Sequence, residues 1–407
     1  MSQVVVKFGA EELEFDLADE AVVGSWSGPR GLSEVEADAA LREAIERPLG
    51  YPPLRQCVAP GDRVAIALGP GLPNPGRIVA ALTDVLRESG IAADAITVIA
   101  PAGVELEPTG VGFIAHDPMD RERLAYLAST SARERRVYLN RVLVDADFAL
   151  PVGLLGYDPV AGRRGPWDSL FPSLSDAPTL EALRRELPEE SSVWSGPSDP
   201  RGEAFEVGWL LGSRFQIGVV PGVGGPVEFD AGLDDEVRAQ GAEAVDRSWR
   251  FRVKTQAEVV VAGIGGPDAP TSLDDLVEGL ATAARLVQRG GKIVALSRAA
   301  GPLGPALQRL TSAGETVNWP RALRGLESAP DSVAARRLAR VLTQADVYLL
   351  SGLDREVVED LSMIPLGRPE DARKLVGRST AVTFLSRAEL TWGEVDREAP
   401  NSRRSER

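Results

Sequence analysis

Histidine, lysine and cysteine, which carry much of enzyme chemistry, are scarce in this 407-residue sequence. It contains one histidine, His116, one cysteine, Cys57, and four lysines. A single cysteine excludes an internal disulfide framework and a cysteine-rich zinc site, and it is typical of a reducing compartment, so we expect a cytoplasmic protein. With one imidazole per chain, neither a histidine-based metal site nor a pair of catalytic histidines can be built.

Long hydrophobic runs and net positive charge are also missing. No uninterrupted apolar run approaches the roughly 20 residues that span a bilayer, so we expect no membrane segment. The formal net charge of −15 opposes general affinity for nucleic acid or anionic membranes, because phosphate binding requires a positive surface field. The arginine-rich stretch at 133–141 also contains Glu134, and its charges are typical of a solvated helix face. We therefore expect neither a nucleic-acid nor a membrane partner.

Strand and helix signals alternate along the chain. Residues 62–69 (DRVAIALG) predict a buried strand, which is followed by the loop GPGLPNPG, an amphipathic helix ending at Gly90 and a strand at 95–103. Strand, helix and strand at this spacing form a βαβ unit with parallel strands. A second module of this kind begins at 257–266 (AEVVVAGIGG). The pattern predicts an α/β fold.

The two ends of the chain have different characters. Residues 1–16 alternate apolar and polar side chains and lack a basic stretch before an apolar core, which predicts a β-hairpin and no signal peptide. Residues 391–407 have almost nothing to bury, so we expect a disordered tail. Between these ends we expect an N-terminal α/β domain at 1–250 and a C-terminal α/β domain at 256–390.

Several segments follow one another in an informative order. They are YPPLRQCVAPGDRVAIAL at 51–68, HDPMD at 116–120 with YLNRVLVDADFALPVG at 138–153, and then VVAGIGGPDAP and ARLVQRGGKIVAL. In this order they resemble the opening segment, the central stretch and the start of the C-terminal domain of the nickel-dependent lactate racemase family. The resemblance covers nearly the whole chain and implies two α/β domains of the lactate-racemase type. It also implies an interdomain cleft, lined by the loops at 69–74, 105 and 158–168.

The resemblance implies a demanding chemistry. Active members use a nickel ion held in a pincer-shaped mononucleotide derived from nicotinate. A lysine tethers this cofactor, a histidine completes the nickel coordination, and two further histidines exchange protons with the substrate hydroxyl. Imidazole suits both nickel ligation and proton transfer near neutral pH, and only a lysine amine forms the tether.

The positions that match these functional residues carry other side chains. The phosphate-binding loop of the family corresponds to Gly69, Gly71 and Leu72, and a leucine cannot pair with phosphate as a guanidinium does. The two catalytic histidines correspond to Glu105 and Asp158.

The tether and the nickel ligand are also replaced. Asp168 stands at the position of the tethering lysine, and no histidine follows residue 116. Near Ala269 and Asp275 the resemblance calls for a lysine and a glutamine, which are missing. We expect no cofactor and no metal, and Trp167 would partly fill the vacated pocket.

Three local features each allow a structural and a functional interpretation. His116 follows an apolar run, so a hydrogen-bonded, half-buried structural histidine is favoured over a catalytic one. The loop GPGLPNPG is either a phosphate cradle or a simple connection between a strand and a helix. Gly263 to Gly266 (GIGG) fits a dinucleotide fingerprint incompletely, and close packing explains it equally well.

The sequence leaves three hypotheses of function. We favour a noncatalytic member of the family that binds a small ligand or regulates an active paralogue. The alternative is an enzyme acting on a 2-hydroxy acid, either by carboxylate-based acid/base chemistry through Glu105, Asp158 and Asp168 or by true racemisation with groups from another subunit. The candidate partners are a small carboxylate or hydroxy acid, a second copy of the chain, or a paralogue.

Overall fold

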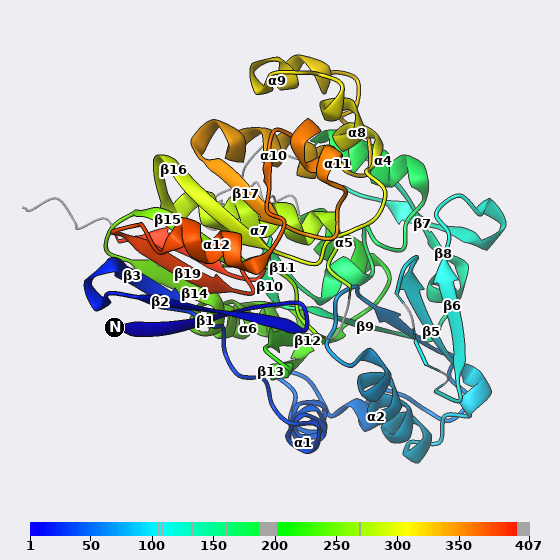
Figure 1. The fold of residues 1–407 in the computed structure, drawn as a ribbon. Coiled ribbons are helices and arrows are strands. Elements are labelled where there is room, and N and C mark those ends of the chain that lie inside the picture. Colours follow the sequence, from blue (N-terminus) through cyan, green and yellow to red (C-terminus); the bar gives the residue numbers. More distant parts are fainter. Residues whose placement is uncertain are drawn as a thin grey trace, which may run out of the picture. The chain divides into compact units, whose positions relative to one another are not determined.

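The chain forms two compact units in a computed structural model that describes residues 1–104, 106–107, 109–131, 133–158, 162–186, 202–267 and 270–396. The middle unit comprises Pro29–Ser248. The terminal unit combines Met1–Gly28 with Trp249–Arg407. Both units are α/β, as the alternating strand and helix signals predicted (Figure 1).

The N-terminal boundary expected from the sequence is wrong, because residues 1–28 lie with the C-terminal module. β1 (Ser2–Phe8) and β2 (Glu11–Leu17) form the predicted antiparallel hairpin. β3 (Val22–Trp26) then pairs in parallel with β19 (Val382–Ser386). Alternation of apolar residues predicts a strand, but it does not identify a partner that lies so far along the chain.

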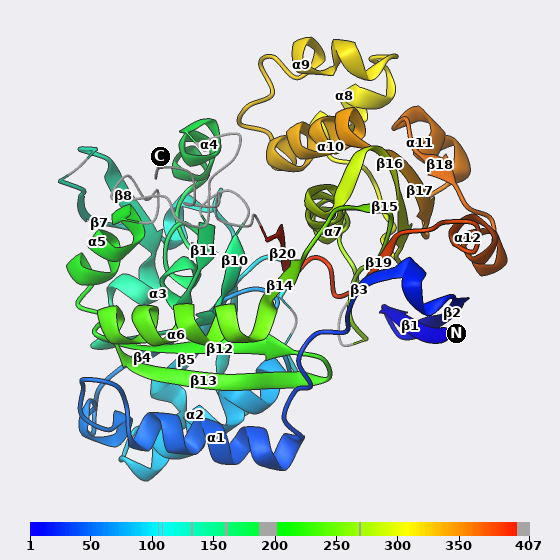
Figure 2. The same ribbon diagram turned by 90° about the vertical axis from the view of Figure 1, so that its left-hand side faces the viewer.

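The middle unit is built on a six-stranded sheet of order β13-β12-β9-β4-β5-β6. All neighbours are parallel except β12 and β13. The strands are β4 (Val64–Leu68), β5 (Ile96–Pro101), β6 (Gly112–His116), β9 (Phe148–Leu154), β12 (Phe215–Gly222) and β13 (Gly225–Leu233). α1 (Glu34–Glu46) and α2 (Pro75–Glu88) cover one face, and α6 (Asp234–Trp249) lies on the other (Figure 2).

The terminal unit is built on an all-parallel sheet of order β18-β17-β16-β15-β19-β3. The remaining strands are β15 (Ala257–Gly263), β16 (Val287–Leu296), β17 (Asp346–Leu350) and β18 (Ile364–Pro365). One face packs on α7 (Leu273–Leu286) and α10 (Ser332–Gln344), and the hairpin and α12 (Pro369–Val376) pack on the other. The shorter helices are α8 (Pro305–Thr311), α9 (Trp319–Ala322) and α11 (Arg355–Asp360).

The expected disorder from residue 391 onward is wrong for the first part of that segment. β20 (Trp392–Val395) pairs in parallel with β14 (Arg250–Val253). The Arg285 guanidinium lies 4.1 Å from the centroid of the Trp392 ring, which is the range of a cation–π contact. Glu394 accepts hydrogen bonds from Arg250 and Arg252, so this strand has packing and charge contacts that hydropathy alone does not reveal. Residues 397–407 lie outside the described residues.

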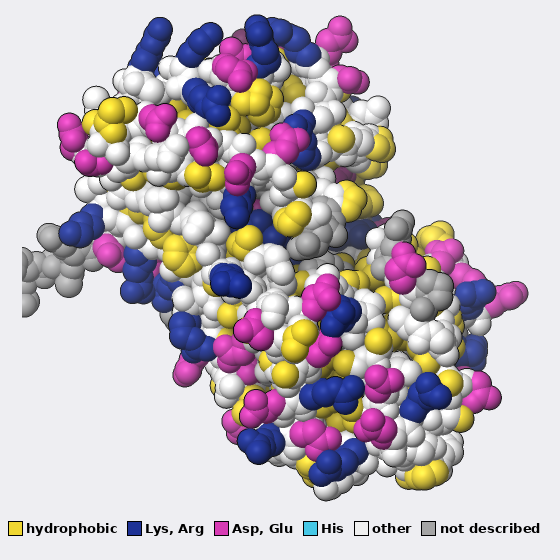
Figure 3. Space-filling model, turned by 60° about the horizontal axis from the view of Figure 1, so that its bottom comes forward, with side chains coloured by type: hydrophobic (Ala, Val, Ile, Leu, Met, Phe, Trp, Pro, Cys, Tyr) yellow, Lys and Arg dark blue, Asp and Glu magenta, His cyan; other side chains and the backbone are white. Residues whose placement is uncertain are grey.

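The surface mixes charges of both signs. Acidic and basic side chains are intermingled on the face shown in Figure 3. Within the described part of the chain, no helix is long and apolar enough to cross a membrane.

We predict that Phe15→Ala destabilises the terminal unit. Phe15 is 2% exposed, and its ring centroid lies 5.4 Å from that of Phe384 on β19. Truncating a buried phenylalanine costs about 3–5 kcal/mol. Urea unfolding of the full chain measures this loss, with Val5→Ala as the control on the same hairpin because Val5 is 37% exposed. Equal effects of the two changes would show that the hairpin is not part of this core.

Candidate functional site

The strand order of the middle unit reverses between β4 and β9. From β4 the chain adds β5 and β6 on one side, and β9 then pairs on the other side. Ligands of open α/β sheets bind beyond the carboxyl ends of the strands at such a reversal. The Gly69 amide here donates to the Val152 carbonyl at 2.8 Å. A Cβ on Gly69 would lie 3.3 Å from the Gly153 Cα and 3.4 Å from the Ser169 Cβ. The structure therefore brings Gly69 together with the turn that contains Asp168.

The loop at 69–74 is a connection between a strand and a helix. Gly71 has a φ of +72°, which favours glycine, and Leu72 is 8% exposed within the core that α2 and β4 share. Arg77, in the first turn of α2, pairs with Glu34 and Asp38 of α1. Its guanidinium therefore has protein partners. Of the two readings, these contacts favour the simple connection over the phosphate cradle.

The Asp168 carboxylate forms a hydrogen bond within its own turn, the short 3-10 helix Pro166–Ser169. One oxygen of its carboxylate accepts the Gly165 amide N–H at 2.9 Å, as capping carboxylates do. The neighbouring Trp167 is 3% exposed, and its ring lies 4.4 Å from that of Phe205. A Cβ on Gly165 would collide with the Trp167 ring. The turn is thus fixed by close packing on both sides of Asp168.

Asp158 ends β10 (Gly156–Asp158), which pairs with β11 (Gly162–Arg164). Beside it lies a polar group that sequence reasoning missed. The Tyr157 hydroxyl donates to Asp246 Oδ1 at 2.5 Å, and Arg163 donates to the same oxygen at 2.6 Å. Asp246 comes from α6, and no spacing in the sequence links it to the hairpin.

Glu105, the third candidate carboxylate, falls outside the described residues. So does Ala269, the position in the terminal unit where the resemblance calls for a lysine.

His116 is a structural histidine, and its burial is deeper than expected because it is 3% exposed. The Asn140 amide lies 3.3 Å from its Nδ1, and the Ser175 carbonyl lies 2.9 Å from its Nε2. Because Asn140 uses its oxygen to accept the Val142 amide, its NH₂ group faces the ring. We therefore assign the tautomer with the proton on Nε2. Both ring nitrogens are engaged within the protein.

The GIGG loop follows β15, and the strand order of the terminal unit reverses between β15 and β19. Glu389 accepts hydrogen bonds from Arg387 Nε at 2.6 Å and from the Gly265 amide at 3.2 Å. Burial raises the pKa of Glu389, and Arg387 opposes that shift. A Cβ on Gly266 would collide with the Arg387 guanidinium. The Asp275 carboxylate accepts the Ser272 amide N–H and hydroxyl, and the Asp275 amide donates to the Ser272 hydroxyl, in the capping box that starts α7. Close packing therefore explains these glycines better than a dinucleotide does.

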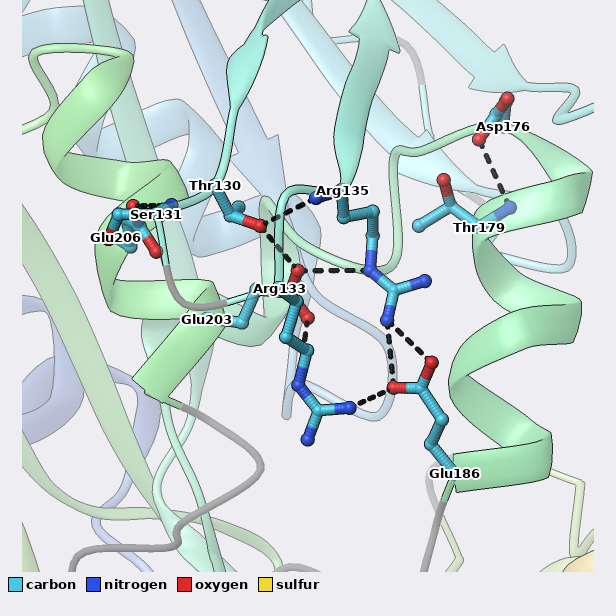
Figure 4. Close-up of polar contacts among 9 residues, drawn as sticks. All are labelled: Thr130, Ser131, Arg133, Arg135, Asp176, Thr179, Glu186, Glu203 and Glu206. Carbon is cyan, nitrogen blue, oxygen red and sulfur yellow. Dashed lines mark hydrogen bonds and ion pairs between the residues drawn. The ribbon is translucent and has the colours of Figure 1, made fainter.

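The arginine-rich stretch is not a solvated helix face. It comprises the end of the turn after β7 (Leu124–Ser129), the whole of β8 (Arg136–Asn140) and the first residue of α3 (Arg141–Val144). Arg135 has a side chain that is 12% exposed and pairs with Glu203 at 2.9 Å and Glu186 at 2.8 Å (Figure 4). Thr130 also donates to Glu203, whose side chain is 3% exposed. One guanidinium thus joins the β7–β8 turn to the end of α4 (Ala177–Glu186) and the start of α5 (Gly202–Leu210).

Two further carboxylates lie on β13 and at the first residue of α6. Burial raises the pKa of Asp230 to about 6, and the Glu228 carboxylate adds to this shift. Burial also raises the pKa of Asp234 to about 6, with a smaller contribution from Asp235. Across the described ranges, no three histidine, cysteine, aspartate or glutamate side chains are grouped to hold a metal ion.

Comparison with known proteins relates this architecture to one family. The family model described as the lactate racemase N-terminal domain matches residues 8–192. The fold is similar to that of the lactate racemase apoprotein from Thermoanaerobacterium thermosaccharolyticum, with a TM-score of 0.79 and 18% identity over 97% of this chain and 100% of that one. A protein from Thermotoga maritima has a TM-score of 0.62 and 14% identity, over 91% of this chain and 100% of that one. No curated protein matches the sequence.

We predict that Arg135→Ala destabilises the middle unit far more than Arg133→Ala. Loss of Arg135 leaves the carboxylate of Glu203 buried without its closest cation, and breaking a buried pair in this way costs about 3–5 kcal/mol. Arg133 is 45% exposed, and exposed ion pairs contribute about 0–1 kcal/mol. Chemical denaturation of both variants measures the difference. Similar losses would mean that the cluster acts only through surface charge.

Proposed function

We propose that this chain is a noncatalytic member of the lactate racemase family, whose N-terminal domain model matches residues 8–192. It binds a small carboxylate or hydroxy acid, or regulates a partner, without nickel-pincer chemistry. The observation that carries the proposal is the hydrogen bond from the Gly165 amide to Asp168. At the position that corresponds to the tethering lysine, the side chain caps its own turn.

The pincer cofactor does not fit the other residues either. A tether requires a lysine amine, and residues 29–248 contain no lysine. A phosphate requires cationic or N–H donors, whereas Leu72 is packed in the core. A nickel ligand requires a free imidazole nitrogen, whereas both nitrogens of His116 are hydrogen bonded. No step of a reaction is therefore assigned to this cofactor.

Carboxylate-based catalysis has less support. Acid/base work by a carboxylate requires an oxygen that reaches the substrate, and the capping bond of Asp168 holds one of its oxygens against the protein. Asp158 lies in a short hairpin beside the Tyr157, Arg163 and Asp246 group. The capping bond favours a structural role for Asp168.

We predict no covalent adduct and less than about a tenth of an equivalent of nickel in protein co-produced with the cofactor-making enzymes, because the required lysine and histidine are missing. Intact mass spectrometry and elemental analysis measure the two quantities. A stoichiometric adduct on the wild-type chain would overturn the proposal.

We also predict that D- and L-lactate, or malate, bind without interconversion. Thermal shift measures binding, and a chiral assay measures turnover. Asp168→Lys should stay inactive even with cofactor supplied, because the active residues work as a unit and their losses are not additive. Asp168→Asn, which keeps an oxygen to cap the turn, is the matched control for stability. Wild-type turnover on the order of 1 per second would contradict the noncatalytic assignment.

A further inference from the structure

A polar layer lies between α6 and the β12–β13 pair of the middle unit. Along β12, Phe215, Ile217 and Val219 face the core shared with α1 and α2, so the alternation of a strand turns Gln216 toward the opposite face. Asp230 on β13 lies on that opposite face, because Phe229 and Ala231 belong to the core. Both Gln216 and Asp230 are 2% exposed. A sheet face covered by a helix is normally apolar, so buried polar side chains here need partners.

Within the described part of the chain, the hydrogen bonds of this layer leave two acceptor oxygens without a donor. Gln216 donates its amide NH₂ to Asp234 Oδ1 at 3.0 Å, and Gln240 donates to Asp230 Oδ1 at 3.0 Å. Among the described residues, Gln216 Oε1 and Asp230 Oδ2 are buried and have no hydrogen-bond partner. An unsatisfied buried acceptor destabilises the fold, and more so when it is charged.

The neighbouring arginines are committed to other carboxylates. Arg247 pairs with Glu228 at 2.8 Å, and Arg238 pairs with Asp235 at 2.7 Å. Within the described part of the chain, neither Asp230 nor Asp234 forms an ion pair. Asp230 is buried, Asp234 is half-buried, and each accepts a glutamine amide. The charges of Arg247 and Arg238 only partly offset the rise in the pKa of these two carboxyls. Buried charge is costly unless a cation pairs with it.

We propose that Asp230, Asp234 and Gln216 bind one divalent, oxygen-preferring cation of the calcium or magnesium type. Carboxylate and amide oxygens are the ligands that these ions take in proteins, and two carboxylates balance a charge of +2. A third acid is not required, because the Gln216 Oε1 oxygen supplies a neutral ligand. The site is independent of the turn at Asp168 and of the proposed function.

The test is calorimetric titration of the full-length, chelator-treated protein with Ca²⁺ and Mg²⁺, and separately with K⁺ and NH₄⁺, together with thermal melts. We expect one divalent ion per chain, a higher melting temperature on binding, and loss of binding in Asp230→Asn. The control is Asp235→Asn, which should bind the ion as the wild type does. Asp235 follows Asp234 on α6, and its side chain is 79% exposed.

A second variant distinguishes a bound cation from a bound water molecule or a bound proton at this site. Gln216→Glu adds a third carboxylate, so it should bind the divalent ion about tenfold more tightly while melting at a lower temperature without the ion. Absence of binding by all four cations would overturn the proposal. So would binding of monovalent ions alone, or weaker binding of the divalent ion by Gln216→Glu.

Discussion

The packing of Trp167 against Gly165 fixes the end of the middle unit where ligands of such sheets bind. The indole leaves no room for a side chain at position 165, and it lies in a core with Ala65 and Ala67 of β4. A Cβ on Gly153 of β9 would approach the Pro166 Cα to 2.9 Å. The turn that holds Asp168 is therefore pressed onto two central strands. Within this turn, the Asp168 carboxylate accepts the Gly165 amide.

The fold is similar to that of a lactate racemase apoprotein, and we propose that the chemistry of the site differs. Shared architecture does not require shared chemistry, since function depends on the residues of a site. Here Leu72 packs in the core, Asp168 caps a turn, and the imidazole of His116 ties β6 to residues 140 and 175. Each of these side chains therefore contributes to packing or to hydrogen bonding within the protein.

The sequence predicted what local periodicity and spacing can encode. The structure confirms the βαβ unit at 62–103 as β4, α2 and β5, the opening hairpin as β1 and β2, and the strand at 257–266 as β15, with small shifts of their ends. Pairings between distant segments could not be predicted, which is why β3 and β20 were missed. The same reason applies to Arg135 and Glu203, because a charge pattern looks alike whether a fold buries it or leaves it in water.

The hairpin and β3 also have a consequence for synthesis on the ribosome. The Lys7 amide donates to Ser386 Oγ, across 379 positions of the chain. Val6, Phe8 and Phe15 therefore leave the ribosome long before the strands that bury them exist. Meanwhile the middle unit, a compact unit of consecutive residues from 29 to 248, can fold as it is made. A nascent chain thus carries an apolar hairpin without a partner through most of translation, and such exposed strands are where chaperones bind and aggregation begins.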